Sequence, residues 1–349
     1  MIVSNRAGTL PFNTTYRVMA SSNLHLHIEN ARAKASLFHI TPERWAAACL
    51  RHRVRARRLW VTFGWDDDGR DNGLATAELL IGVPADRTRL AARAPRLRWL
   101  HATSAGIDGL LPLDWLPRGV AFTNNRGAHG VKAEQFLRMA YTLLHSRMPA
   151  IIANQRAHRW EQLFSPSIAG KTALVIGLGD LGKAAARAAH SLGMRVIGVR
   201  RTAKKSRHAD TVHPYARLDM LLPRADFVTI AVPLTAETRN LMSRERLAHM
   251  KRSAGLINIA RAPVADYDAL AERLTRGELA GAVLDVAEPE PLPADSPLWD
   301  TPNLIITPHI SCDDGEHYVD ITLDLWFDNL ERYLEKKVLR RRVDPIAGY

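Results

Sequence analysis

Cysteine is scarce in this chain: Cys49 and Cys312 are the only two among 349 residues. This scarcity excludes a disulfide framework and a cysteine-rich metal site, and we expect no bound metal. No apolar run approaches the roughly 18 residues of a membrane span, and residues 1–23 lack the apolar centre of a signal peptide. The sequence therefore predicts a cytoplasmic protein with no membrane partner. We expect residues 1–23 to form a poorly ordered extension at its N-terminus.

Acidic residues are also outnumbered, 36 against 48 lysines and arginines, which gives a formal net charge of +12. A surplus of this size is one mark of nucleic-acid binding. Here the basic residues gather in three stretches far apart in the chain, at 51–58, 195–207 and 336–342. None of these stretches has the interleaved aromatic side chains on which single-stranded nucleic acids stack. The charge therefore predicts a solvated surface and no nucleic-acid partner.

What the chain does have is enough length and apolar content, 46%, for two domains with separate cores. Its first part predicts a small α/β unit, with strand patterns at 59–63, 77–83 and 97–101 and a helix that begins at Pro42 after the cap Thr41. Further on, six strand patterns alternate with helical ones, at 172–176, 195–199, 226–230, 255–259, 281–285 and 304–307. This alternation is typical of a doubly wound parallel sheet. A last amphipathic helix near 316–336 would bury one face, and we expect it to pack on the first domain.

A glycine motif follows the first strand of that second set and opens an alanine-rich helix. It reads Gly177-Leu-Gly179-Asp180-Leu181-Gly182, the spacing that binds a dinucleotide in a strand–turn–helix context. Gly177 permits the tight turn, Gly179 lets the backbone approach a pyrophosphate, and Gly182 lets the helix pack on the strand. The helix N-terminus then presents its N–H groups to the phosphates. We expect Asp180 and Leu181 to contact the cofactor as well.

The end of the next strand indicates which dinucleotide is bound. An NAD site usually has an acid about 20 residues beyond the glycines, where it accepts from the ribose hydroxyls. Here the strand 195–199 ends in Arg200, Arg201 and Thr202, with no acid. Guanidinium groups suit a 2′-phosphate, which they can bind bidentately. The sequence predicts NADP as the preferred cofactor, with NAD as the other option.

Three polar residues, Arg261, Glu290 and His309, follow three later strand patterns. The carboxyl ends of parallel strands share one edge of a sheet, so we expect these side chains near the nicotinamide. When a hydride reduces a 2-keto acid, the keto oxygen must gain a proton, and His309 can supply it. A nearby Glu290 would favour the imidazolium form and orient the ring. Arg261 can hold the substrate carboxylate and polarise the carbonyl.

From about residue 77 to residue 329 the chain resembles the D-isomer-specific 2-hydroxyacid dehydrogenases. Besides the glycine motif, the resemblance rests on Thr103-Ser-Ala-Gly-Ile-Asp108, Thr123-Asn-Asn-Arg-Gly127, Val232-Pro-Leu-Thr-Ala-Glu-Thr238, Ile257-Asn-Ile-Ala-Arg261, Leu284-Asp-Val286 with Glu290-Pro-Leu-Pro293, and Thr307-Pro-His-Ile310. It implies that Arg261, Glu290 and His309 are the catalytic set. It also implies that backbone N–H groups of Ser104, Ala105 and Gly106 hold the substrate carboxylate.

On the cofactor side, the resemblance implies that Val232 and Pro233 line the adenosine and that Asp285 meets the nicotinamide amide, together with the backbone at Ile259 and Ala260. It implies an α/β fold of two Rossmann-like domains. A doubly wound cofactor domain, residues 129–311, would be inserted into a smaller flavodoxin-like substrate domain, residues 24–128 plus 312–349. It further implies a homodimer joined through the cofactor domains.

The chain also departs from the family pattern, which usually has glycine after the catalytic arginine. This chain has Ala262 and Pro263 there, so we expect a shifted or stiffened loop. The leading hypothesis is an oxidoreductase that transfers a hydride between NAD(P)H and a small 2-keto acid, of glyoxylate or hydroxypyruvate type, giving D-2-hydroxy acids.

Two alternatives to this function stay open at the level of sequence. One is oxidation of formate or phosphite on the same scaffold. The formate enzymes carry glutamine where this chain has Glu290, which argues against formate, whereas phosphite oxidation can use the same three residue types. The other alternative is a dinucleotide-sensing corepressor or scaffold with little turnover, because fold alone does not fix function.

Overall fold

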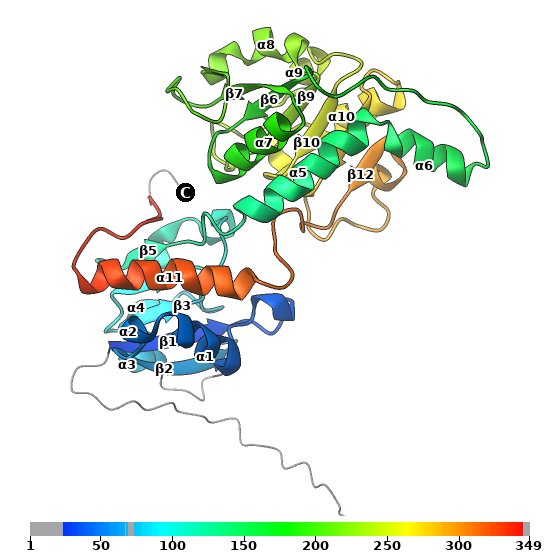
Figure 1. Ribbon diagram of the computed structural model, residues 1–349. Coiled ribbons are helices and arrows are strands. Elements are labelled where there is room, and N and C mark those ends of the chain that lie inside the picture. The colour runs from blue at the N-terminus through cyan, green and yellow to red at the C-terminus, as the bar shows by residue number, and fades with distance from the viewer. Residues whose placement is uncertain (1–23, 67, 69–72, 345–349) are drawn as a thin grey trace, which may run out of the picture. The chain divides into compact units, whose positions relative to one another are not determined.

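The computed structural model describes residues 24–66, 68 and 73–344, and these form two compact units (Figure 1). The described residues of the first unit are those up to 125 together with 316–344, and the second unit comprises residues 126–315. The chain therefore crosses between the units twice, after residue 125 and after residue 315. The extension expected over residues 1–23 lies outside the described residues.

The first unit contains a five-stranded sheet in the order β2-β1-β3-β4-β5. All of its strand pairs are parallel. This is the flavodoxin-like order, in which the first strand lies between the second and the third. The strands are β1 (Leu24–Asn30), β2 (Leu59–Trp65), β3 (Leu79–Ile81), β4 (Trp99–His101) and β5 (Ala121–Thr123).

The second unit contains a seven-stranded parallel sheet in the order β12-β11-β10-β9-β6-β7-β8. Counted within the unit, this is the Rossmann order 3-2-1-4-5-6 with one further strand at the edge, and the strand order reverses between β6 and β9. The strands are β6 (Thr172–Ile176), β7 (Arg195–Val199), β8 (Thr211–His213), β9 (Phe227–Ile230), β10 (Gly255–Asn258), β11 (Gly281–Leu284) and β12 (Leu304–Ile306). The predicted fold class, two parallel-sheet α/β domains, is confirmed.

Helices cover both sheets and complete the α/β layers (Figure 1). The first unit has α1 (Pro42–Arg51), α2 (Arg53–Ala56), α3 (Gly73–Thr76), α4 (Leu90–Arg93) and α11 (Tyr318–Leu334), with short 3₁₀ turns at η1 (Ser36–Phe38), η2 (Asp108–Leu110) and η3 (Leu113–Trp115). The second unit has α5 (Gly130–His145), α6 (Met148–Arg156), α7 (Asp180–Ser191), α8 (Leu218–Leu221), α9 (Arg244–Ala248) and α10 (Tyr267–Thr275), with 3₁₀ turns at η4 (Tyr215–Arg217), η5 (Leu222–Arg224), η6 (Ala262–Val264) and η7 (Pro297–Asp300).

The sequence pattern predicted six of the seven strands of the second sheet, all except β8, to within a residue at each end. It missed β8, which is three residues long and only partly buried. In the first unit it missed β1 and β5. Four of the seven β1 residues are polar. His25, His27 and Glu29 alternate with apolar residues, an asparagine ends the strand, and together they dilute the apolar signal. The predicted cap of α1 is confirmed, because the hydroxyl of Thr41 accepts a hydrogen bond from the N–H of Arg44.

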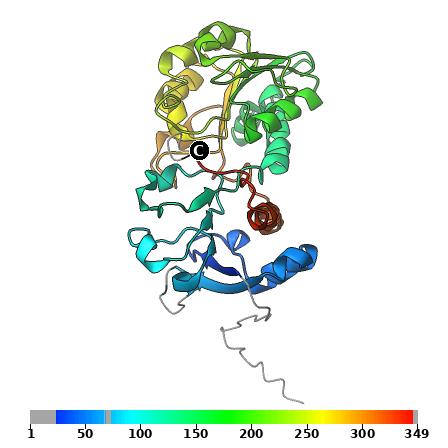
Figure 2. The same cartoon turned by 90° about the vertical axis from the view of Figure 1, so that its left-hand side faces the viewer.

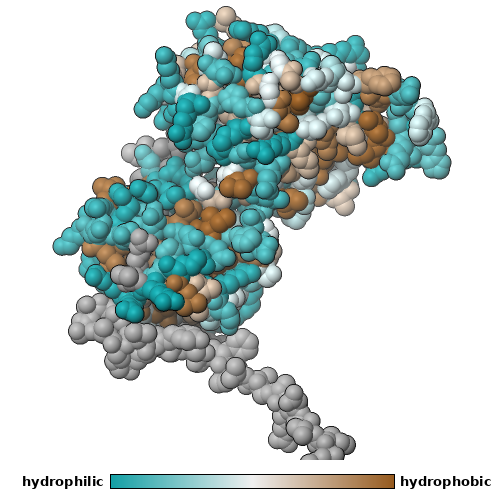
Figure 3. Space-filling model, viewed as in Figure 1, coloured by the Kyte–Doolittle hydropathy of each residue, from teal (hydrophilic) through white to brown (hydrophobic). Residues whose placement is uncertain are grey.

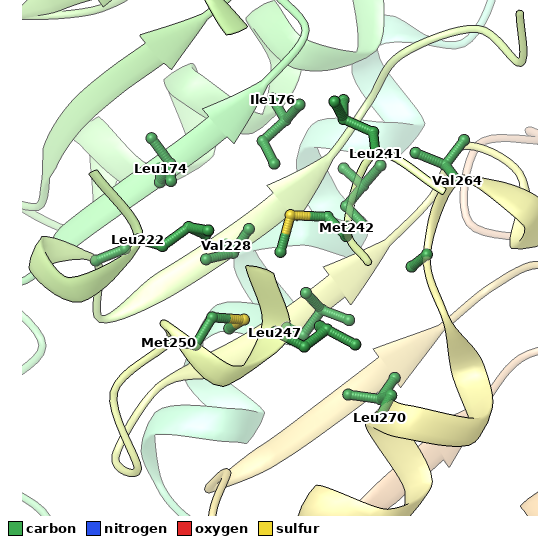
Figure 4. Close-up of a cluster of buried hydrophobic side chains, with 14 of the residues drawn as sticks. Leu174, Ile176, Leu222, Val228, Leu241, Met242, Leu247, Met250, Val264 and Leu270 are labelled. Carbon is green, nitrogen blue, oxygen red and sulfur yellow. The ribbon is translucent and has the colours of Figure 1, made fainter. Parts of the chain in front are cut away.

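Each face of the second sheet carries its own apolar core. On one face, side chains of β6 and β9 pack against α9 and α10, and Figure 4 shows Ile176 and Val228 of the strands in one cluster with Leu247 and Leu270 of these helices. On the other face, the strands pack against α5 and the alanine-rich helix α7. Because both faces are covered, the strands are almost wholly apolar, as is typical of a buried parallel sheet.

The C-terminal helix α11 completes the core of the first unit, as the sequence predicts. It is coloured orange to red in Figure 1 and is seen end-on in Figure 2. The indole ring of Trp326 in this helix stacks on the indole ring of Trp99 in β4. The ring centroids are 5.2 Å apart and the ring planes are inclined by 8°. Both side chains are fully buried, together with Phe327 and Leu323 of the same helix. This domain is therefore built from two segments of the chain that lie about 200 residues apart. No helix among the described residues is long and apolar enough to cross a membrane.

Candidate active site

The predicted cofactor and catalytic residues of the second unit all follow the carboxyl ends of its strands. Because these strands are parallel, the ends lie at one edge of the sheet, where α/β proteins bind their ligands. Along the chain, Gly177 follows β6, Arg200 follows β7, Val232 follows β9, Arg261 follows β10, Asp285 follows β11, and His309 follows β12. The reversal of strand order between β6 and β9 lies between the glycine turn and Val232.

The glycine turn has the close approaches that its sequence predicts. Gly177 has a φ of +95°, and a Cβ there would collide with the carbonyl oxygen of Ala231. A Cβ on Gly182 would collide with the carbonyl oxygen of Gly177, so this glycine lets α7 pack against the turn. Around Gly179, in contrast, a Cβ would meet no described atom within 4 Å. The open side of the turn therefore lies at the position where a pyrophosphate would approach the backbone.

Helix α7 begins directly at this open side. Its cap residue is Gly179, so no side-chain oxygen accepts from the first N–H groups of the helix. Asp180 is exposed, and Leu181 is partly exposed. Backbone N–H groups of this kind, together with the helix dipole, favour an anion. The turn and the helix end fit the pyrophosphate of a dinucleotide.

The stretch after the glycine motif contains no acid that could accept from a ribose. Residues 183–209 include no aspartate or glutamate. The next acid, Asp210, accepts from the N–H of Val196 at 2.7 Å, at the beginning of β7 and not at its end. At the end of β7, the Arg200 N–H donates to the His213 carbonyl at 3.0 Å. Arg201 and Thr202 follow and are exposed.

The turn that carries Arg261 is held by two residues to which the sequence analysis gave no role. Asn258 is fully buried at the end of β10. Its side-chain amide donates to the Arg261 carbonyl at 3.0 Å and to the Tyr267 hydroxyl at 2.9 Å, and its Oδ1 accepts from the N–H of Ala260 at 2.9 Å. The Tyr267 hydroxyl donates in turn to the carbonyl of Val286 at 3.0 Å. These bonds tie the end of β10 to the end of β11, and burial raises the pKa of Tyr267 well above its ordinary value.

Ala262, which stands where the family usually has glycine, begins the short 3₁₀ turn η6. It is buried at 5% exposure. None of the positive-φ residues lies in this turn, so alanine takes an ordinary backbone conformation there. Pro263 fits at the first turn of a helix, because its missing N–H has no partner to lose. The alanine and proline are thus accommodated by a helical turn just after Arg261.

Glu290 and His309 form a pair. Oε2 of Glu290 lies 2.8 Å from Nδ1 of His309, and Oε1 of Glu290 accepts from the N–H of Ala287 at 3.0 Å. Both side chains are half-exposed, at 46% for His309 and 40% for Glu290. Since Nδ1–H donates to the carboxylate, Nε2 is the ring nitrogen left for another partner. His309 lies on a tight turn with a φ of +54°.

Asp285 is a buried carboxylate that organises the segment around His309. It is 1% exposed. Its oxygens accept from the hydroxyl of Thr307 at 2.6 Å, from the N–H of Ile310 at 2.9 Å and from the N–H and hydroxyl of Ser311. These donors lie on both sides of His309 in the chain. The carboxylate therefore fixes the loop that carries the histidine.

The remaining predicted cofactor contacts lie at the same strand ends. Val232 is buried at 3% exposure beside the glycine turn, and Pro233 is exposed. The carbonyl of Pro233 accepts from the hydroxyl of Thr238 at 2.6 Å, which closes the turn after β9. Ile259 and Ala260, which follow β10, are both buried.

The predicted carboxylate-binding residues, Ser104, Ala105 and Gly106, belong to the first unit. They follow β4 at the carboxyl edge of its sheet. Ser104 and Ala105 are partly exposed and Gly106 is exposed. In the hydrogen-bond network of the described residues, none of their three backbone N–H groups donates to another protein group.

A protein-family model for the NAD binding domain of D-isomer specific 2-hydroxyacid dehydrogenases matches residues 139–311. A glyoxylate/hydroxypyruvate reductase B from Pectobacterium carotovorum is 36% identical over 283 residues, which cover 78% of this chain and 87% of the relative. A glyoxylate reductase from Korarchaeum cryptofilum is 34% identical over 239 residues, 66% of this chain and 71% of the relative. The chain belongs to the D-isomer specific 2-hydroxyacid dehydrogenases.

Solved structures of D-2-hydroxyacid dehydrogenases share both domains. The enzyme from Xanthobacter autotrophicus, determined with NADPH and MES, aligns with a TM-score of 0.80 at 30% identity over 94% of this chain and 100% of that chain. An NADPH-dependent glyoxylate/hydroxypyruvate reductase from Sinorhizobium meliloti, determined with NADP and sulfate, aligns with a TM-score of 0.77 at 28% identity over 93% of this chain and 99% of that chain. The protein is thus an NAD(P)-dependent oxidoreductase with an NAD-binding domain.

Several residues that hold the segments carrying the predicted site residues, in one unit or the other, were given no role in the sequence analysis. They are Asn124, Asn258, Tyr267, Thr307, Ser311 and Tyr318. Four of them lie inside or beside the motifs that carry the family resemblance, so their presence in those motifs was a signal. Tyr267 and Tyr318 lie outside every motif, and nothing in the local pattern marks them.

Proposed function

We propose that this protein is an NADPH-preferring reductase of small 2-keto acids, of glyoxylate or hydroxypyruvate type, that forms D-2-hydroxy acids. The observation that carries the proposal is the Glu290–His309 pair, at 2.8 Å, at the edge where the cofactor strands end. A carboxylate that accepts from one imidazole nitrogen orients the other as an acid or base. The named activities of the two reductase relatives agree with this chemistry.

When bound, the reduced nicotinamide supplies the hydride that reduces the keto carbon. The task of the protein is then to hold the substrate and to move one proton. His309 holds that proton at Nε2 and gives it to the keto oxygen as negative charge develops there. Glu290 accepts from Nδ1–H and stabilises the imidazolium before the transfer, and in the reverse reaction the neutral imidazole takes the proton back.

The substrate carboxylate is proposed to accept hydrogen bonds from one side chain and from the backbone of one loop. The Arg261 guanidinium offers a planar pair of N–H groups that matches a carboxylate. It also stabilises negative charge on the keto oxygen. The backbone N–H groups of Ser104, Ala105 and Gly106 are the other proposed carboxylate donors. Recognition by these groups would favour small 2-keto acids over simple aldehydes, which lack the charge.

The preference for NADPH is proposed from the basic end of β7. Arg200 and Arg201 stand where an NAD site would have its ribose-binding acid, and no acid occurs between residues 183 and 209. Partial burial, followed by the charges of Arg207, Arg187 and Lys183, lowers the pKa of His208 in the same segment. The positive charges that disfavour a protonated His208 would favour a negatively charged group, such as the 2′-phosphate of NADP. The NADPH and NADP of the two solved relatives agree with this assignment.

A homodimer through the cofactor unit is also proposed. Helices α5 and α6 expose Val131, Met139 and Met148, at 73%, 45% and 36%, and the segment after α6 exposes Trp160 at 96% and Phe164 at 82%. Figure 3 shows hydrophobic side chains on the side of this unit where α5 runs. Aromatic and methionine side chains are enriched in interfaces between proteins. Light scattering on a size-exclusion column would test this proposal, and a monomeric mass at all concentrations would contradict it.

A panel of 2-keto acids assayed with both NADPH and NADH tests the proposed function. Glyoxylate and hydroxypyruvate should be reduced with the higher kcat/KM values, and NADPH should be the better cofactor. Pyruvate and 2-ketobutyrate control for substrate size. Formate and phosphite, assayed in the oxidative direction, test the alternative hydride donors. Tight dinucleotide binding without turnover of any substrate would contradict the proposal and favour a sensing role on this fold.

A further inference from the structure

We propose that Tyr318 and Asn124 are positioning residues that orient the loop Thr103–Gly106 for carboxylate binding. The inference rests on the proposed function and adds residues to it. The Tyr318 hydroxyl donates to the Thr103 carbonyl at 2.7 Å, and the side-chain amide of Asn124 donates to the Ala105 carbonyl at 2.7 Å. Between them, the Ser104 carbonyl accepts from the backbone N–H of Asn125 at 3.0 Å.

Three consecutive carbonyl groups of the loop are therefore held by donors from the same unit. A trans peptide group is planar, and its carbonyl and its N–H point in opposite directions. None of the cis peptide bonds lies in this loop. Each of the carbonyls of residues 103, 104 and 105 shares a peptide group with the N–H of the next residue. Fixing these carbonyls on their donors therefore points the N–H groups of Ser104, Ala105 and Gly106 away from those donors. These are the same three N–H groups that donate to no described protein group.

Successive backbone N–H groups that face one way make a concave anion site. Such a site costs little to form at the moment of binding if its geometry is already fixed. Here the fixing donors are rigid, because Asn124 is fully buried and Tyr318 is 5% exposed. The Tyr318 ring also packs edge-on against Phe38, with centroids 4.8 Å apart. The loop is therefore preorganised by side chains that themselves have little freedom.

The two donors lie close to the two places where the chain leaves and re-enters the first unit. Asn124 comes just before the crossing that follows residue 125, and Tyr318 comes just after the crossing that follows residue 315. The Tyr318–Thr103 bond joins residues 215 positions apart in the chain. The loop Thr103–Gly106 therefore depends on a hydrogen bond from the C-terminal segment. The sequence of the loop itself gives no sign of this dependence.

The test uses Tyr318→Phe in the full-length protein, because this change removes one hydroxyl and keeps the ring. Loss of one hydrogen bond that aims the loop should raise KM for glyoxylate about 3- to 10-fold. The kcat should change less than about 2-fold, because the carboxylate is held equally in the ground state and the transition state. KM for NADPH should stay at its wild-type value, and the Tm should fall by no more than about 2–4 °C, the effect of losing one buried hydrogen bond. Asn124→Ala should give the same KM-against-kcat split, and its Tm reports any loss of folding separately.

Tyr333→Phe is the matched control, since Tyr333 lies on the same helix 15 residues beyond Tyr318 (333 − 318), is partly buried and stacks on Trp99. It should leave KM for glyoxylate unchanged. Equal KM increases in Tyr333→Phe and Tyr318→Phe, or wild-type KM values in both Tyr318→Phe and Asn124→Ala, would overturn the positioning role.

A second measurement separates this proposal from the proposed reaction. Oxalate, a non-reducible dicarboxylate, is titrated by calorimetry into wild type and Tyr318→Phe, each saturated with NADP. Weaker oxalate binding in the variant supports the positioning role even if the wild-type protein reduces no 2-keto acid. Equal oxalate affinity, or no oxalate binding by the wild type, would contradict it whatever the turnover.

Discussion

Oε2 of Glu290 lies 2.8 Å from Nδ1 of His309, although the two residues come from segments that follow different strands. The pairing leaves Nε2 of the imidazole as the ring nitrogen open to another partner, and this is the nitrogen to which the proposed function assigns the proton transfer. Glu290 is held in turn by the N–H of Ala287. The imidazole and the carboxylate that orients it are thus in contact in the structure.

His309→Ala should remove most of the turnover. Loss of a positioned general acid typically costs 10²- to 10⁴-fold, so we expect kcat to fall by about that factor. NADPH affinity, measured by fluorescence titration, should persist, because the glycine turn is unchanged. His249→Ala is the control, since His249 is an exposed histidine beyond α9. Near-normal kcat in His309→Ala across the pH range would refute the proton-transfer role.

Glu290→Gln should retain a hydrogen-bond acceptor for Nδ1–H but remove the charge that favours imidazolium. We expect kcat to fall by about 10- to 100-fold, less than in His309→Ala, because an oriented imidazole remains. Steady-state assays with glyoxylate and NADPH measure the difference between the two variants. A fall in kcat larger than that of His309→Ala would instead point to a direct role of the carboxylate in the reaction.

Arg200→Asp should move cofactor preference from NADPH toward NADH. A hydrogen bond to a charged group contributes about 1.5–3 kcal/mol, so the NADPH/NADH ratio of kcat/KM should fall about 10- to 100-fold. The introduced carboxylate repels a 2′-phosphate and can accept from ribose hydroxyls. Arg224→Asp, an exposed arginine before β9, is the charge-matched control. An unchanged ratio would remove Arg200 from phosphate recognition.

The sequence predicts those parts of the candidate site in which a short motif specifies both the residue type and its place at a strand end. The glycine turn, Arg261, Glu290 and His309 each stand at a strand end, and a parallel sheet brings such ends to one edge. Contacts between segments far apart were not predictable in this way. The Tyr318–Thr103 hydrogen bond depends on how α11 packs on the sheet of the first unit. No local sequence pattern specifies which residue of α11 will lie beside which residue of that sheet.

Strands were missed where the burial pattern is weak. β8 has one apolar residue, Val212, between two polar ones, so it has little apolar signal, whereas the equally short edge strand β12 is wholly apolar. β1 alternates apolar residues with His25, His27 and Glu29, which are buried but satisfied by one another and by threonines. A buried polar network looks like a solvated face in the sequence, because the pattern does not show which partners the fold will supply.

Asp285→Asn should lower turnover by disturbing the loop that carries His309. An amide offers one acceptor oxygen where the carboxylate offers two, and its NH₂ would face the donors from Ile310 and Ser311. We expect kcat to fall about 10-fold or more and the Tm to drop, because small misplacements of a catalytic group are costly. Asp295→Asn, an exposed aspartate in the following loop, is the control. A rise in KM for NADPH with unchanged kcat would favour the nicotinamide contact instead.

Mild acid should destabilise the first unit through two buried histidines. Burial lowers the pKa of His25 to about 4, and burial together with Arg341 lowers that of His101 to about 3. Both stay neutral in the folded state as the pH falls below about 6.5, while the unfolded chain takes up protons there. Because the unfolded state binds more protons, the free energy of unfolding falls with decreasing pH. The two groups together contribute up to about 2.7 kcal/mol per pH unit between about pH 6 and 4.

Urea unfolding at pH 7.5, 6.0 and 5.0 measures this dependence, followed by tryptophan fluorescence because Trp99 and Trp326 lie in the core of this unit. His25→Gln can keep hydrogen bonds to the Thr62 and Thr76 hydroxyls that the imidazole contacts at 2.9 Å, and it cannot take up a proton. The variant should lose up to about 1.4 kcal/mol per pH unit of the slope below pH 6. His249→Gln controls for an exposed histidine and should leave the slope unchanged. The same slope in His25→Gln and wild type would show that His25 takes up no extra proton on unfolding.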